Sequence, residues 1–116
     1  MKISSLTKCI STFAMMVIPT AAFAAPTMSG VNKIGNIVVY NTGYVVFGIT
    51  LPPESAWSTC NLNHMFVVNL NTSGGRAIYE TAVNAQLQNK NVVIAGSGTC
   101  STMSQVEDVS YLQMYA

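Results

Sequence analysis

The chain has 116 residues, a length that suits one domain rather than two. Half of its residues are hydrophobic, only 8% are charged, and the formal net charge is +1. A chain with so few basic residues lacks the positive surface that nucleic acid or an anionic membrane would attract, so the composition excludes both as partners.

Residues 1–24 have the order of a secretory signal peptide. Two lysines precede an apolar run at residues 13–18, and Ala-Phe-Ala at residues 22–24 forms a cleavage site. The apolar run is shorter than a membrane-spanning helix, which argues against a retained anchor. We expect cleavage after Ala24 and a β-rich domain over residues 25–116 that is secreted or periplasmic, with a net charge of about −1 and no later segment that inserts into a membrane.

The first part of the mature chain predicts a lead-in and a hairpin. Residues 25–32 are small and polar and are expected to form a loose segment. Two β-branched and aromatic runs, 34–40 and 44–50, flank Asn-Thr-Gly, a sequence typical of a tight turn. Two prolines then predict a surface loop over residues 51–59, because proline cannot donate to a strand ladder.

The second part predicts a strand, a helix and two more strands. Residues 64–70 are expected to form the third strand, and a polar capping sequence precedes an amphipathic helix at about 74–89. Strands follow at 91–95 and 106–115. The fold class is therefore β-rich α+β, with about five antiparallel strands and one helix between the third and fourth. An OB-like barrel and a helix on an open antiparallel sheet fit this order equally.

The cysteines predict one disulfide. Removal of the signal peptide leaves Cys60 and Cys100, an even number in an oxidising compartment. A redox pair would need C-x-x-C spacing, and a zinc site would need more ligands than two thiols and His64.

No pattern indicates catalysis or a cofactor. His64 lies in an apolar strand without a nucleophile at a recognisable spacing, so a packed or hydrogen-bonded role is expected for it. Glu107 and Asp108 are neighbours in a strand, where successive side chains point to opposite faces; they are expected to be solvated or to cap a loop. We therefore predict no catalytic residue, no metal and no cofactor.

Aromatic and amide side chains supply the binding candidates. Aromatic rings beside amides suit sugar rings or protein partners. The candidates are Trp57, Tyr40, Tyr44, Asn61 and Asn63, with Asn69 and Asn71 in the same amide-rich stretch. Trp57 lies three residues before Cys60, so a core position packed on the disulfide is an alternative for it.

A resemblance adds to these expectations. It rests on Gly-Arg-Ala-Ile-Tyr at 75–79, Gln-Asn-Lys at 88–90, the strand at 91–94, Gly-Thr-Cys at 98–100 and Glu-Asp-Val-Ser-Tyr at 107–111. In these segments the chain resembles small secreted proteobacterial proteins of unknown function. In layout it also resembles, more distantly, the OB-fold B subunits of AB5 toxins of the subtilase-cytotoxin and pertussis-like groups. That resemblance implies a pentamer that binds glycans, and no binding residue is carried over from it.

Three functional hypotheses follow. The first is an exported, non-enzymatic binding module that recognises a glycan or a protein, as a monomer or a homo-oligomer. The second is a periplasmic inhibitor or accessory protein that binds another protein. The third, and the least favoured, is a small secreted hydrolase that would use His64.

Overall fold

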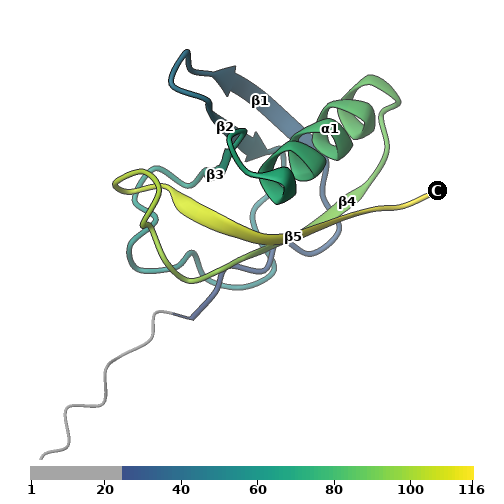
Figure 1. The fold of residues 1–116 in the computed structure, drawn as a ribbon. Helices are drawn as coiled ribbons and strands as arrows, with labels where there is room; N and C mark the ends of the chain where they lie inside the picture. Colours follow the sequence, from purple (N-terminus) through teal and green to yellow (C-terminus); the bar gives the residue numbers. More distant parts are fainter. Residues whose placement is uncertain (1–24) are drawn as a thin grey trace, which may run out of the picture.

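The computed structural model describes residues 25–116, and Figure 1 shows their arrangement. The expected signal peptide at residues 1–24 lies outside the described residues and stays a prediction. Within residues 25–116, no helix is long and apolar enough to cross a membrane.

The predicted hairpin is confirmed. Strands β1 (Ile34–Val39) and β2 (Tyr44–Ile49) pair in antiparallel register. The N–H of Tyr40 donates to the carbonyl of Tyr44 at 2.8 Å, and Gly43 takes a φ of 93°, which glycine adopts without strain.

The next two elements are β3 (Phe66–Asn69) and helix α1 (Ser73–Leu87). The strand begins two residues later than expected, because His64 has a left-handed φ of 55° that an extended strand cannot contain. The predicted cap is confirmed, since the Thr72 hydroxyl accepts a hydrogen bond from the N–H of Gly75 at 3.0 Å.

Strands β4 (Val92–Gly96) and β5 (Glu107–Met114) complete a five-stranded sheet in the order β1-β2-β3-β5-β4. The expectation of purely antiparallel strands is wrong at one position, because β3 and β5 run parallel. Since β4 and β5 are antiparallel, β3 and β4 run in opposite directions, and α1 joins them across the sheet. The five paired strands do not close into a barrel, so of the two expected architectures the structure has the helix on an open sheet.

Hydrophobic side chains cover both faces of the sheet. On one face α1 contributes Ala82 and Ala85 to a core that contains Phe47, Phe66 and Ile94. On the other face a smaller cluster joins Val46 and Val67 to Val106, from the segment that enters β5. This smaller cluster packs the β4–β5 connection against strands β2 and β3.

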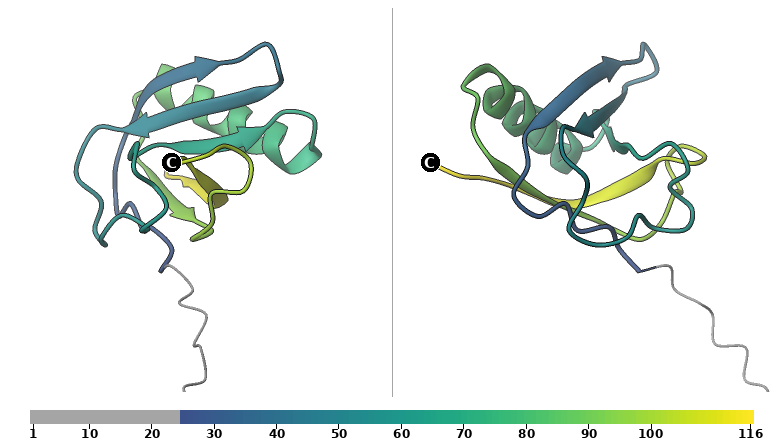
Figure 2. Two further views of the ribbon diagram at one scale, coloured as in Figure 1. Left: turned by 90° about the vertical axis from the view of Figure 1, so that its left-hand side faces the viewer. Right: turned by 180° about the vertical axis from the view of Figure 1, so that it is seen from behind.

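The lead-in is an ordered part of the fold, which corrects the expectation that residues 25–32 are loose. Thr27, Ser29 and Asn32 are buried, and β-bridges join Met28 to Ala95 and Asn32 to Val92. Figure 2 shows this segment passing beside β4 before the chain enters β1. Its polar side chains bond to other segments of the fold: Ser29 accepts from the N–H of Ile94, Asn32 accepts from the N–H of Leu51, and the Thr27 hydroxyl donates to Glu107.

The expectation that Glu107 is solvated is also wrong, because this residue is completely buried. Its carboxylate accepts hydrogen bonds from the N–H and hydroxyl of Thr27, the Asn61 amide and the N–H of Gly98. A Cβ atom on Gly96 would lie 1.9 Å from a carboxylate oxygen of Glu107, so only glycine fits there. All four donors are uncharged, and together they compensate the burial of the carboxylate.

The predicted disulfide is confirmed. Cys60 and Cys100 are bonded, with their Cα atoms 6.0 Å apart. The bond joins the loop before β3 to the loop before β5. It closes a loop of 40 residues, which stabilises the fold by about 4 kcal/mol in the chain-entropy model.

Gly74 and Gly75, at the start of α1, give a matched test of how closely the helix packs against the end of β3. A Cβ on Gly75 would lie 1.9 Å from the carbonyl oxygen of Asn69, whereas a Cβ on Gly74 would meet no atom within 4 Å. We expect Gly75→Ala to lower the free energy of unfolding by about 2 kcal/mol or more. Gly74→Ala should leave it unchanged or raise it by about 0.5 kcal/mol. Urea unfolding of both variants measures this, and equal effects would contradict the close helix–strand contact.

Candidate binding pocket

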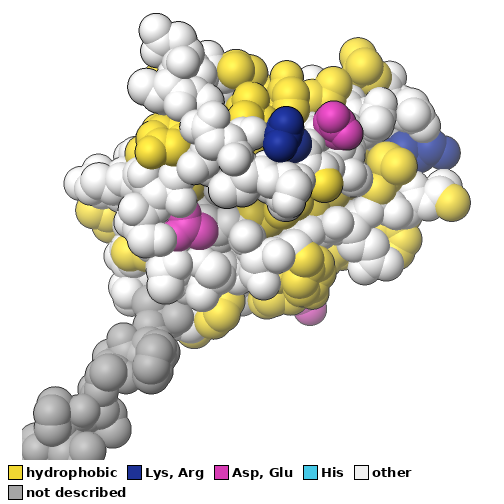
Figure 3. Space-filling view, viewed as in Figure 1, with side chains coloured by type: hydrophobic (Ala, Val, Ile, Leu, Met, Phe, Trp, Pro, Cys, Tyr) yellow, Lys and Arg dark blue, Asp and Glu magenta, His cyan; other side chains and the backbone are white. Residues whose placement is uncertain are grey.

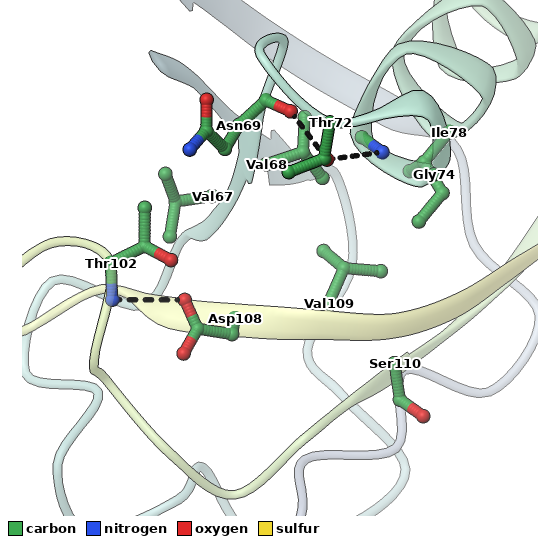
Figure 4. Close-up of a pocket in the computed structure, with 11 residues that line it drawn as sticks. Val67, Val68, Asn69, Thr72, Gly74, Ile78, Thr102, Asp108, Val109 and Ser110 are labelled. Carbon is green, nitrogen blue, oxygen red and sulfur yellow. Dashed lines mark hydrogen bonds between the residues drawn. The ribbon is translucent and has the colours of Figure 1, made fainter.

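A pocket lies where β3 and β5 separate. The two strands pair at only two positions, Phe66 with Glu107 and Val67 with Asp108. Beyond these pairs, a hollow of about 360 Å³ lies between the strands and the first turn of α1 (Figure 4). The parallel pairing therefore places the ends of β3 and the start of β5 around one space.

The pocket combines apolar walls with polar groups. Val67, Val68, Val109 and Ile78 supply the apolar surface. The polar side chains come from β3, the helix cap, the β4–β5 connection and β5, and they are Asn69, Thr72, Thr102, Asp108 and Ser110. Figure 4 shows these residues arranged around the space from four separate segments. Such a lining is typical of sites that bind small molecules.

The helix end is held against β3 by short-range contacts. The Thr72 hydroxyl donates to the carbonyl of Asn69 at 2.8 Å and also accepts from the N–H of Gly75. Gly75 is buried at this contact, while Gly74 is exposed and faces open space. The first turn of α1 thus forms one fixed side of the pocket.

Asp108 holds the opposite side in place. Its carboxylate accepts hydrogen bonds from the Thr99 hydroxyl, the N–H and hydroxyl of Ser101 and the N–H of Thr102. Partial burial raises the pKa of Asp108 and is the largest single influence, but the hydrogen bonds from Ser101, Thr102 and Thr99 together outweigh it. The pKa therefore lies below its ordinary value. Asp108 therefore caps the loop at residues 99–102, which is one of the two roles expected for it.

The two candidate tyrosines lie at the hairpin end that adjoins the pocket. Tyr44 is the register partner of Asn69, which lines the pocket. The hairpin tip is joined to the segment after β3, because the N–H of Leu70 donates to the carbonyl of Gly43 at 2.7 Å. Tyr40 is 46% exposed, and Tyr44 is half-buried. The structure therefore places Tyr44 beside Asn69, and Tyr40 lies one strand further away, across the hairpin from Tyr44.

The other three candidates lie at the opposite end of the β2–β3 ladder. The Trp57 ring stacks on His64, with ring centroids 4.6 Å apart, and contacts Phe66 at 5.8 Å. Phe66 pairs with Phe47, whereas Tyr44 pairs with Asn69 at the other end. The structure therefore separates Trp57 from the tyrosines. His64 stacks on Trp57, but it is exposed and lies before β3 rather than inside the strand as expected.

The two asparagines near Trp57 differ in exposure. Asn61 is 1% exposed, and its side chain bonds to Glu107 and to the N–H of Met65. Asn63 is exposed, and its N–H donates to the carbonyl of Gln105. Asn61 is thus an internal structural amide, while the Asn63 side chain lies at the surface.

Sequence reasoning missed most of the pocket. Thr72, Thr102, Asp108 and Ser110 come from three separated segments that meet only because β3 and β5 are neighbours. An antiparallel reading of the strands gives no reason to place the start of β5 beside β3. The available signal is the polar stretch at the end of the third strand, where Asn69 counts among the amide-bearing binding candidates but Thr72 is expected only to cap the helix.

The comparisons with known proteins give no relative for this chain. Protein-family models, curated proteins and solved structures all yield no match. Among residues 25–116, no group of three or more His, Cys, Asp or Glu side chains is placed to hold a metal ion.

The loop around Asp108 gives a pH-dependent prediction. Because its pKa is lowered in the folded state, Asp108 contributes stability above its unfolded pKa of about 3.9, and this contribution is lost as the pH falls through the folded value. We expect Asp108→Asn to lower the free energy of unfolding by about 1 kcal/mol at neutral pH. The difference from the unmodified protein should shrink below about pH 4.

Urea unfolding of both proteins across this pH range measures the effect. Glu80→Gln, at an exposed position of α1, serves as the control with a small effect at every pH. A constant deficit for Asp108→Asn down to the lowest pH would contradict the role of the ionised carboxylate.

Proposed function

We propose that this protein is an exported, non-enzymatic binding module that holds one sugar residue of a glycan in the pocket between β3 and β5. The observation that carries the proposal is the 360 Å³ hollow with apolar walls and polar side chains around them. The disulfide supports export, because such bonds persist in oxidising compartments.

The lining suits a sugar better than a purely apolar ligand. A sugar ring presents C–H groups on its faces and hydroxyls around its edge. Val109 and Ile78 offer surface for the C–H groups, while Asn69 and Ser110 offer hydrogen-bonding groups for hydroxyls. The hollow lies within the range of about 300 to 1,000 Å³ that small-ligand sites occupy. Tyr40, exposed at the nearby hairpin, can contact a second sugar residue through its ring.

The position of the pocket also supports the proposal by analogy. In OB folds, oligosaccharides bind on the face of strands 2 and 3 and on the loops that join strands 1–2 and 4–5. In this protein, β3 supplies Val67, the β4–β5 connection supplies Thr102, and the β1–β2 turn lies beside Asn69. The analogy concerns the elements used, since fold alone does not establish function.

The outer edge of β1 favours a second candidate, a module that binds protein. β1 ends the sheet, and its residues Val38 and Val39 are 41% and 54% exposed. An uncharged edge strand with exposed apolar side chains is a template for pairing with another chain. The partner would be a further copy in a homo-oligomer or the target of an inhibitor or accessory protein. Figure 3 shows few charged side chains on one face of the molecule.

Filling the pocket tests the proposed function. Gly74 faces open space at the pocket, so Gly74→Phe should occupy the hollow without a clash at its Cβ. We expect this variant to lose at least about 90% of glycan binding on an array, since it removes the space for the ligand. Asn84→Phe, exposed further along the same helix, is the matched control and should bind as the unmodified protein does.

Circular dichroism and thermal unfolding verify that both variants are folded. Undiminished glycan binding by a folded Gly74→Phe variant would contradict the site. A protein that light scattering shows to be monomeric, and that binds no glycan, would contradict the glycan-binding function itself.

A further inference from the structure

Asp108 is the one ionisable side chain among the residues that line the pocket. The other ten lining residues are apolar, hydroxyl-bearing, amide-bearing or glycine. Figure 4 shows the Asp108 side chain at the end of the hollow next to Thr102. Whatever enters the pocket therefore meets one carboxylate and no basic side chain of the lining.

The hydrogen bonds of Asp108 leave its negative charge without a cation. The oxygen Oδ2 accepts from the Thr99 hydroxyl at 3.1 Å and from the N–H and hydroxyl of Ser101 at 3.0 and 2.6 Å. The oxygen Oδ1 accepts from the N–H of Thr102 at 3.2 Å, and the Thr102 side chain also helps to lower the pKa of Asp108. All of these donors are neutral. Oδ1 has fewer hydrogen bonds than Oδ2, so Oδ1 is the oxygen at which a donor of a ligand would bind.

We propose that the pocket selects its sugar by charge, and that it takes an amino sugar with a free ammonium group, which pairs with Oδ1 of Asp108. This inference rests on the proposed glycan-binding function and names the class of sugar. An ammonium group is both a hydrogen-bond donor and a cation, so it can bond to Oδ1 and compensate the negative charge of Asp108 at the same time. A uronic acid in the same pocket would place a second carboxylate near Asp108 and would be repelled.

The expected selectivity is modest, because Asp108 is only half-buried. Ion pairs that remain in contact with water are weak, and their measured strength corresponds to an affinity change of about two- to fivefold. The ammonium sugar should therefore bind about two- to fivefold more tightly than its hydroxyl analogue. The preference should fall as salt is added, since salt screens exposed charges.

Three sugars of similar shape test this selectivity on the unmodified protein. Glucosamine, glucose and glucuronic acid differ in carrying an ammonium, no charge and a carboxylate. Titration is followed by the amide signals of Gly74, Gly75 and Ser110 in NMR spectra, because these residues line the pocket. The pH is mildly acidic, so that the amine of glucosamine is protonated and Asp108 stays ionised.

A charge added at the rim gives a matched pair of variants. Ser110 is exposed and lines the pocket, whereas Gln113 is exposed on the same strand and is not among the pocket residues. Ser110→Lys should compensate Asp108 and remove the preference for glucosamine over glucose. Gln113→Lys adds the same charge to the protein and should keep the preference. Neither variant alters the hydrogen bonds that hold the Asp108 loop.

The outcomes separate this inference from the function on which it rests. An affinity order of glucosamine, glucose and glucuronic acid, with loss of the first preference in Ser110→Lys alone, supports charge selection. Equal affinities with shifts at the pocket amides would overturn charge selection and keep the sugar site. Shifts of those amides by none of the three sugars would overturn both.

Discussion

The fold depends on one buried carboxylate, that of Glu107. It accepts hydrogen bonds from Thr27 in the lead-in, from Asn61 before β3 and from Gly98 after β4, so three segments far apart in the chain meet at one side chain. A buried carboxylate without these donors would be strongly unfavourable, and each donor would in turn lose its acceptor. Gly96 is required for the same reason, because a side chain there would occupy the position of the carboxylate.

The neighbouring residues Glu107 and Asp108 lie on opposite faces of β5 and have different structural roles. Glu107 points inward and ties the lead-in to the sheet, while Asp108 lines the pocket and holds the loop that contains Thr102. Both residues lie in the short stretch where β5 pairs with β3. The interaction that fixes β5 in the interior therefore also fixes the carboxylate that faces the pocket, and the site follows from the same strand placement as the core.

The features that sequence predicts well are those decided by neighbours in the chain. The turn at Gly43, the cap at Thr72 and the amphipathic helix each depend on residues a few positions apart, and the disulfide depends on there being two cysteines to pair. The parallel pairing of β3 with β5, the ordered lead-in and the burial of Glu107 depend on contacts between distant segments; Thr27 and Glu107 are 80 positions apart. The sequence predicted that both residues are exposed to solvent, because no residue near either of them in the chain indicates that Thr27 and Glu107 are hydrogen-bond partners. Most of the pocket was missed for the same reason, although the binding candidates include Asn69, which lines it, and Tyr44, which pairs with Asn69.

The fold depends most on the hydrogen bond between the Thr27 and Glu107 side chains, and a double-mutant cycle measures its energy most directly. Thr27→Val, Glu107→Gln and the double variant are unfolded in urea, and their free energies of unfolding are compared with that of the unmodified protein. Because the two side chains share a buried hydrogen bond, the effects should be non-additive, with a coupling energy of about 1 to 3 kcal/mol. Effects that add to within about 0.5 kcal/mol would show that the two residues act independently and would contradict this account.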